Sequence, residues 1–101
     1  MEQIKSEELK SAVLSWTGRG TSVSPLRNDD LVLGKFGKKA QALLNQVKIL
    51  EEDFYKSDAH LRATSLAEME IIAIQDFNVI HPDIDQEIAK AFAWCYSFDY
   101  K

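Results

Sequence analysis

Apolar residues recur at intervals of three and four over most of this chain, a spacing that places them on one face of an α-helix. Four segments show this spacing. They cover residues 7–16, the stretch from Asn28 or Asp29 to a point between Tyr55 and Asp58, residues 65–81, and the last part of the chain from a start between Pro82 and Asp85. The pattern predicts an all-α fold, a single compact four-helix domain over residues 1–101. Short connections at residues 60–64 and 81–82 favour antiparallel neighbours.

The second segment carries the longest apolar series. It runs through Leu33, Phe36, Ala40, Leu43, Val47, Leu50 and Phe54. This series predicts one continuous helix, with Leu43, Val47 and Leu50 almost fully buried. Gly34 and Gly37 interrupt it, and each costs a helix about 1 kcal/mol relative to alanine. We interpret the two glycines as positions where another backbone could approach closely.

The third segment opens with a capping box. The Ser65 hydroxyl can accept a hydrogen bond from the backbone N–H of Glu68, and the Glu68 side chain can reach back toward the N–H of Ser65. The helix must end by His81, because Pro82 disfavours helical backbone at the residue before it.

Aromatic residues crowd the end of the chain. Five of the ten lie in nine residues: Phe92, Trp94, Tyr96, Phe98 and Tyr100. A strand would place all five rings on one face, whereas a helix divides them between two flanks. The helical interpretation is favoured, because the residues upstream already have helical spacing. Its apolar arc is wider than that of an ordinary surface helix, which a central position or a second contact surface would explain.

Composition narrows the possible partners and compartments. The net charge is −4, from 16 acidic and 12 basic residues, which argues against nucleic acid as a partner. The first eight residues lack the basic flank and apolar run of a signal peptide, and no stretch approaches the ~20 apolar residues of a membrane span. The single cysteine, Cys95, favours a reducing compartment. We therefore expect a cytoplasmic protein without a membrane partner.

The residues that could carry chemistry do not form a catalytic or metal-binding set. His60 follows Asp58 at a spacing that could join two ligands, but a zinc site needs three or four. We interpret His60 as a surface or loop residue, and His81 as a residue that packs and caps a free backbone group at a helix end. Cys95 falls on the inward arc of the last helix, where a thiol is inert. We expect no enzyme activity, no cofactor and no metal.

Two regions are candidates for contact with a partner. The loop after residue 17 could present Trp16, Arg19 and Arg27, although core packing is the favoured interpretation of Trp16. The acidic run at residues 51–53, together with Asp58, concentrates negative charge at one end of the longest helix. With a possible anchor on the last helix, the predicted partner-binding residues are Trp16, Arg19, Arg27, Glu51, Glu52, Asp53, Asp58 and Trp94.

Residues 15–20, 81–84 and 94–101 are the three segments in which the sequence comes closest to that of a known class of protein, although none of them identifies the class. In size, acidity, helical layout and lack of catalytic groups, the chain resembles the small immunity proteins of bacterial toxin systems. The likeness is one of general character and transfers no binding residue. It implies a non-enzymatic protein-binding module that neutralises a cognate toxin, with a basic toxin domain as partner. The alternative is a small regulatory or structural subunit that homodimerises through its aromatic C-terminal helix.

Overall fold

Helices make up all the regular structure of residues 6–101, which are the residues that the computed structural model describes. In chain order they are α1 (Ser6–Thr17), α2 (Asp29–Lys35), the 3-10 turn η1 (Gly37–Lys39), α3 (Ala40–Phe54), α4 (Ala59–Arg62), α5 (Leu66–Ile80) and α6 (Gln86–Asp99). No strand occurs in this part of the chain. The predicted all-α class is therefore confirmed, whereas the predicted number of four helices is wrong.

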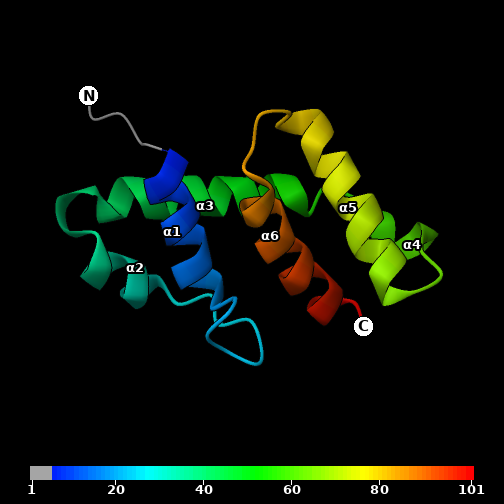
Figure 1. Cartoon of the computed structure of the whole chain (residues 1–101), viewed down its shortest axis with the longest axis horizontal. Helices are drawn as coiled ribbons and strands as arrows, with labels where there is room; N and C mark the ends of the chain where they lie inside the picture. Colours follow the sequence, from blue (N-terminus) through cyan, green and yellow to red (C-terminus); the bar gives the residue numbers. More distant parts are fainter. Residues whose placement is uncertain (1–5) are drawn as a thin grey trace.

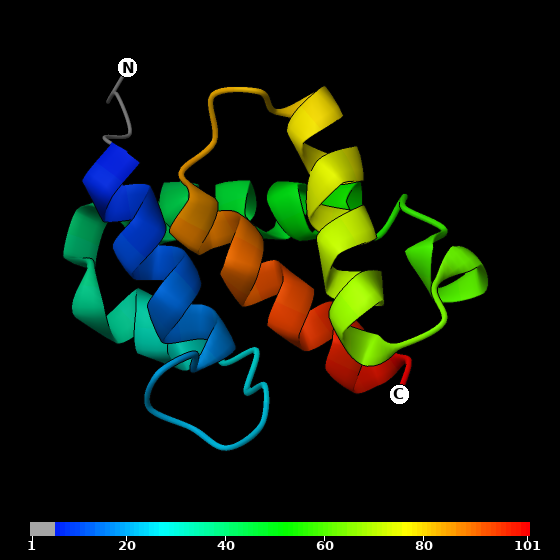
Figure 2. The same cartoon turned by 45° about the vertical axis from the view of Figure 1, so that its right-hand side comes forward.

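The helices form two layers (Figures 1 and 2). The longest axis of the molecule follows α3, and α1, α6 and α5 cross it on one side. Helix α6 lies between α1 and α5 and contacts both, while α1 and α5 each also contact α3. Helix α2 packs beside α1 and α3, and the short α4 packs beside α5. The C-terminal helix is thus central.

The predicted second helix is divided into α2, η1 and α3. The backbone leaves the helical conformation at Phe36 and turns at Gly37, whose φ of +59° is unfavourable for a residue with a side chain. A Cβ atom added at Gly34 or Gly37 would meet nothing within 4 Å, so the interpretation of a close backbone approach is wrong. The turn also rotates α2 relative to α3, so that Val32 is buried and Leu33 is exposed.

The core prediction for the remaining part of that series is confirmed. Leu43, Val47 and Leu50 are almost completely buried on the inner face of α3. The aromatic centre of the core is formed by Phe54 with Phe77, whose ring centroids are 5.0 Å apart, and by Phe92 from α6, which contacts both. One side chain each from α3, α5 and α6 thus joins the two layers.

Side chains cap the helices where the sequence predicts it. Asn28 Oδ1 accepts hydrogen bonds from the first backbone N–H groups of α2. Ser65 Oγ accepts one from the Glu68 N–H at 3.1 Å, as the capping box predicts. The Glu68 carboxylate does not return to Ser65; it accepts from the N–H of Thr64 at 3.0 Å. Helix α5 then ends at Ile80, one residue before the position that Pro82 restricts.

The aromatic C-terminal segment is helical to Asp99, which confirms the helical interpretation over the strand. Phe92, Tyr96 and Cys95 are buried because α6 packs against helices on both sides. This central position explains the wide apolar arc. Two of the rings near the end, Phe98 and Tyr100, keep part of their surface exposed.

Helix α4 was not predicted. Residues 60–64 were expected to be a plain connection, but a four-residue helix covers Ala59–Arg62. None of the helices that residues 6–101 form combines the length and apolarity needed to cross a bilayer.

Candidate functional site

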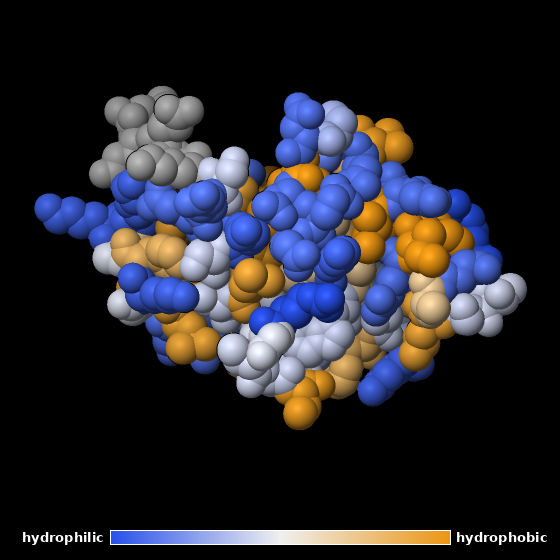
Figure 3. Space-filling model, in the orientation of Figure 1, coloured by the Kyte–Doolittle hydropathy of each residue, from blue (hydrophilic) through white to orange (hydrophobic). Residues whose placement is uncertain are grey.

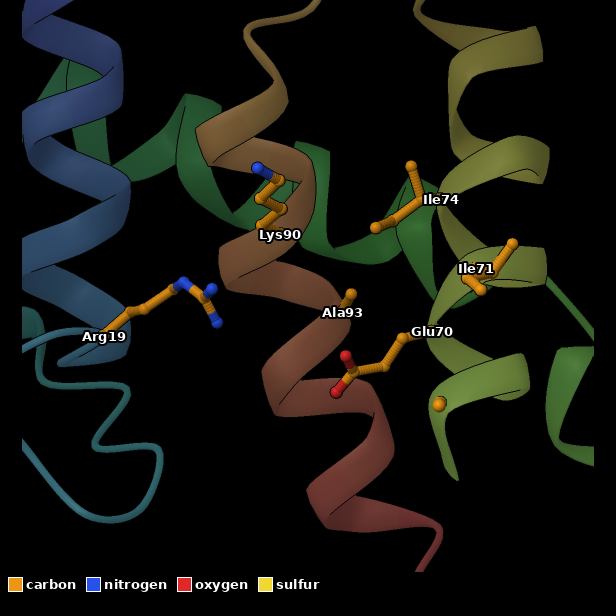
Figure 4. A pocket seen from close by; sticks show the side chains of 7 residues that line it. Arg19, Glu70, Ile71, Ile74, Lys90 and Ala93 are labelled. Carbon is orange, nitrogen blue, oxygen red and sulfur yellow. The ribbon is translucent and has the colours of Figure 1, made fainter. Parts of the chain in front are cut away.

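A trough of about 360 Å³ opens on the surface between α5 and α6 (Figure 4). It is bounded on the far side of α6 by the loop that follows α1. Seven residues line it: Arg19, Ala67, Glu70, Ile71, Ile74, Lys90 and Ala93. We refer to this feature as the α5–α6 trough.

The loop after α1 holds Arg19 at the rim. Gly18 and Gly20 flank Arg19 with φ values of +80° and +87°, which glycine adopts without strain. A Cβ atom at Gly18 would lie 2.8 Å from the Leu26 side chain, so the loop closes tightly on itself. The N–H of Leu26 also donates to the Thr17 carbonyl oxygen at 2.9 Å. From this turn the Arg19 side chain extends toward α6 (Figure 4).

Helix α5 supplies the apolar wall. Its inner face buries Met69, Ala73 and Phe77, yet its outer side is also apolar. Ile71 is 56% exposed and Ile74 is partly buried beside it. Apolar residues are visible along this side of the molecule in Figure 3. An ordinary surface helix carries polar residues on its solvent face, so exposed isoleucines there are not required for folding.

The floor is formed by α6 at a small residue. Ala93 is 1% exposed and contributes only a methyl group between the larger side chains of the two walls. Lys90 stands one turn before it on the same helix (Figure 4). The depression therefore depends on the size of residue 93.

The two walls differ in charge. Arg19 has no carboxylate partner among residues 6–101, and the Lys90 ammonium lies 3.7 Å from the exposed Glu87 carboxylate. Across the trough, the Glu70 carboxylate accepts a hydrogen bond from Ser97 Oγ at 2.6 Å. The trough thus has two cations on one side, one carboxylate on the other, and an apolar strip on α5.

The predicted anchor Trp16 lies in the core. It is 3% exposed, and its Nε1–H donates to Asp29 Oδ1 at 2.8 Å. This hydrogen bond, followed by the one from Lys48, lowers the pKa of the Asp29 carboxyl. Trp16 therefore packs internally, which was the favoured interpretation, and is not presented to a partner.

Arg27 is occupied by contacts within the chain. Its Nε donates to Glu51 Oε2 at 2.8 Å, and Nη2 donates to Asp99 Oδ2 at 2.6 Å and to the Tyr55 hydroxyl at 2.7 Å. Arg27 has φ +50°, so these contacts hold a backbone conformation that is rare for a residue with a side chain. Burial, and then the hydrogen bond to Asp99, raises the pKa of the Tyr55 phenol. This cluster joins the loop to the ends of α3 and α6.

The acidic run is also largely paired. Besides Glu51, Asp53 accepts from His81 Nε2 at 2.8 Å and lies 3.0 Å from Lys56 Nζ. These contacts, with His81 the larger, lower the pKa of the Asp53 carboxyl. Asp58 accepts from Arg62 Nε at 2.7 Å. Within the part of the chain that the structure describes, Glu52 is the member of the predicted acidic set without an ion pair.

The histidines have internal roles that differ from those predicted. His60 lies on α4, where its ring stacks on Tyr100 at 4.0 Å and its Nδ1 lies 2.6 Å from the Tyr96 hydroxyl. Because that hydroxyl donates to the Ser57 carbonyl oxygen, Nδ1 must carry the hydrogen and act as donor. His81 bonds the Asp53 carboxylate rather than a backbone group.

Cys95 is fully buried, and burial raises the pKa of its thiol to about 12. Among residues 6–101, no three His, Cys, Asp or Glu side chains gather closely enough to hold a metal ion. The Cys95 thiol does not line the α5–α6 trough, and no such metal-binding cluster of residues 6–101 lies there.

Of the eight predicted contact residues, the trough contains Arg19 alone. Trp94 is partly buried on α6, outside the trough lining. Ile71, Ile74 and Lys90 were missed, although one signal was available: the apolar residues of α5 exceed what a single stripe requires.

No protein-family model, curated protein or solved structure matches the chain. The feature with the clearest binding chemistry is the α5–α6 trough, where apolar surface meets the Arg19 guanidinium, which has no carboxylate partner within the described part of the chain.

Proposed function

We propose that this protein is a non-enzymatic protein-binding module that contacts its partner through the α5–α6 trough. The observation that carries the proposal is the position of Ile71. It is 56% exposed on a helix whose opposite face already fills the core. It lies beside Ile74 and across the trough from Arg19, which has no carboxylate partner among residues 6–101 (Figure 4).

Burial of this surface supplies a driving force for association. Removing a large aliphatic side chain from water contributes roughly 1.5–3 kcal/mol when burial is complete. Arginine is among the residues that contribute most at protein interfaces, because its planar guanidinium combines apolar faces with several donors. The trough therefore combines large apolar side chains with an arginine, two kinds of group that contribute strongly to binding energy.

Neutralisation of a toxin by direct binding is the specific role that we propose within this class. The net charge of −4 suits a basic partner. Because Glu51, Asp53 and Asp58 are paired within the chain, they act through the overall field that guides the encounter rather than through direct contacts.

The alternative is a homodimer through the C-terminal helix, and part of that helix is already committed to the fold. Phe92 and Tyr96 are buried inside the chain, and the Tyr100 ring stacks on His60. Trp94, Phe98 and the exposed part of Tyr100 would remain as its aromatic contacts. No further observation favours this alternative.

The test compares two matched substitutions. Ile71→Glu places a charge in the trough, and Ile49→Glu places one at a similarly exposed position on α3, 51% exposed. Wild-type protein is used to capture a partner from the native host, and the purified partner is then titrated with each variant. We expect Ile71→Glu to weaken binding roughly tenfold or more and Ile49→Glu to leave it within about twofold.

Circular dichroism establishes that both variants are folded. Equal losses for the two variants would contradict the assignment of the surface. If no protein is captured and light scattering shows a tight homodimer that Phe98→Glu dissociates, the alternative replaces the proposal.

A further inference from the structure

The shape and charge of the trough identify the kind of segment that it binds. We infer that the α5–α6 trough holds an amphipathic helix of the partner, with its apolar face on Ile71, Ile74 and Ala93. An Asp or Glu at the edge of that helix pairs with Arg19 and Lys90. This inference rests on the proposed function and specifies the partner segment.

The dimensions favour a helix over a small ligand. Ala67, Ile71 and Ile74 succeed one another by four and three residues along α5, so they span about 10 Å, or two helical turns. A small-molecule site encloses most of its ligand, whereas this trough is open to solvent along one side. A second helix lying along α5 would present apolar residues at the matching spacing, as in helix-in-groove recognition.

The charges define which edge of the partner helix is acidic. The Arg19 guanidinium has no carboxylate partner within residues 6–101, and its fork of donors matches a carboxylate in two-point contact. Lys90 adds a second positive charge on the same side. An acidic residue placed there would gain two favourable interactions.

Glu70 sets the opposite edge. Its carboxylate faces α6 from the α5 wall and accepts a hydrogen bond from Ser97 Oγ at the edge of the trough (Figure 4). A second acid beside it would be repelled, and a neutral or basic residue would not. The partner helix is therefore acidic on the α1 side and neutral or basic on the α5 side, which fixes its orientation. A nucleic acid backbone is excluded by the same carboxylate and by the apolar wall.

The experiment uses a displayed library of 16-residue helical peptides, selected on the immobilised full-length protein. Apolar residues are fixed at positions i, i+4 and i+7, and the two flanking edges are randomised among acidic, basic and neutral residues. We expect enrichment of Asp and Glu on one edge alone. A consensus peptide is then synthesised together with a version in which that acid is replaced by Lys.

Charge reversal at the rim provides the decisive measurement. Arg19→Glu should weaken binding of the consensus peptide roughly tenfold. The Arg19→Glu protein should also bind the peptide with Lys in place of the acid more tightly than the wild-type protein does. Lys38→Glu, at an exposed position of η1 outside the trough, is the matched control and should change either affinity less than about twofold.

The outcomes separate this inference from the proposed function. If the selected peptides require Ile71 but are neutral or basic on both edges, or ignore Arg19→Glu, the inference is wrong and the binding module stands. If the native partner and the peptides are indifferent to Ile71→Glu, the proposed function itself fails. A homodimer that Ile71→Glu dissociates would show that a second copy of the chain fills the trough, which also overturns the inference.

Discussion

Helices α3 and α5 are both 15 residues long and both contribute to the core, but they use their outer faces differently. The outer face of α3 is polar, and Ile49 is its single large exposed apolar side chain. Helix α5 exposes four of them. Ile71 and Val79 lie on the face opposite Met69, Ala73 and Phe77, and Leu66 and Ile80 are exposed at the two ends of the helix. The sequence of α3 is accounted for by folding alone. That of α5 contains apolar residues that the core does not use.

This difference separates residues selected for folding from those available for binding. A substitution on the inner face of either helix should alter stability, whereas one on the outer face of α5 should alter binding with little effect on stability. The following changes test that separation, from the largest expected effect on stability to the smallest.

The inner face of α3 should be the most sensitive. Leu43→Ala should lower the free energy of unfolding by about 2–5 kcal/mol, because it removes a buried side chain and leaves a cavity. Ile49→Ala on the outer face is the control and should cost about 0.5 kcal/mol or less. Urea melts of both variants provide the comparison, and similar losses would show that the two faces of α3 are not distinct.

The start of α5 depends on a side-chain cap that α3 lacks. Ser65→Ala should cost about 1 kcal/mol, because the Glu68 N–H loses its acceptor. Ser65→Asp restores an acceptor at the same position and should recover most of the loss. Thermal unfolding of the two variants measures this, and no recovery with Asp would contradict a capping role.

The Asp53 carboxylate, near the end of α3, is hydrogen-bonded to His81, the residue that follows α5. His81, followed by Lys56, lowers the pKa of Asp53, so its contribution to stability is present above the unfolded-state pKa of roughly 4. That contribution is lost as the pH falls through the lower pKa of the folded state. Asp53→Asn should remove part of the acid sensitivity below about pH 4 and cost up to roughly 1 kcal/mol at neutral pH. Glu52→Gln, exposed next to it, is the control in urea melts across this range. Equal effects of the two substitutions would refute the assignment.

The outer face of α5 should be the least sensitive. Ile71→Gln and Val79→Gln should each change the free energy of unfolding by less than about 0.5 kcal/mol, because both side chains are exposed. Met69→Gln on the inner face of the same helix should cost clearly more, since it buries an amide. If Ile71→Gln proves as costly as Met69→Gln, the apolar excess of α5 serves folding and not binding.

The sequence predicts most of this architecture where local signals agree. Ser65 and Pro82 bound α5 within a residue, and the spacing of Leu43, Val47 and Leu50 identifies the inner face of α3. The break at Gly37 was missed because apolar spacing continues through a turn that depends on φ alone. Helix α4 was missed because a helix of four residues has no periodicity to detect.

The trough was predictable only in part. The sequence places Trp16, Arg19 and Arg27 together as candidate contacts, because one loop could present all three and because Trp and Arg are favoured anchors at interfaces. The structure leaves only Arg19 at the trough. The burial of Trp16 and the pairing of Arg27 depend on Asp29, Glu51 and Asp99, which the fold brings close from distant positions. Contacts between residues far apart in the chain produce no pattern in the local sequence. The surplus apolar residues of α5 were visible in the sequence, but which of them face solvent is decided by α6.

The contact between Arg27 and Asp99 has a consequence for the order of folding events. These residues are separated by 72 positions, so their contact can form only after α1, α3 and α6 have come together. Interactions that form after the transition state influence the unfolding rate more than the refolding rate. Stopped-flow measurements on Asp99→Asn should therefore show faster unfolding and nearly unchanged refolding. By the same reasoning, this cluster controls how long the folded chain persists rather than how quickly it is reached.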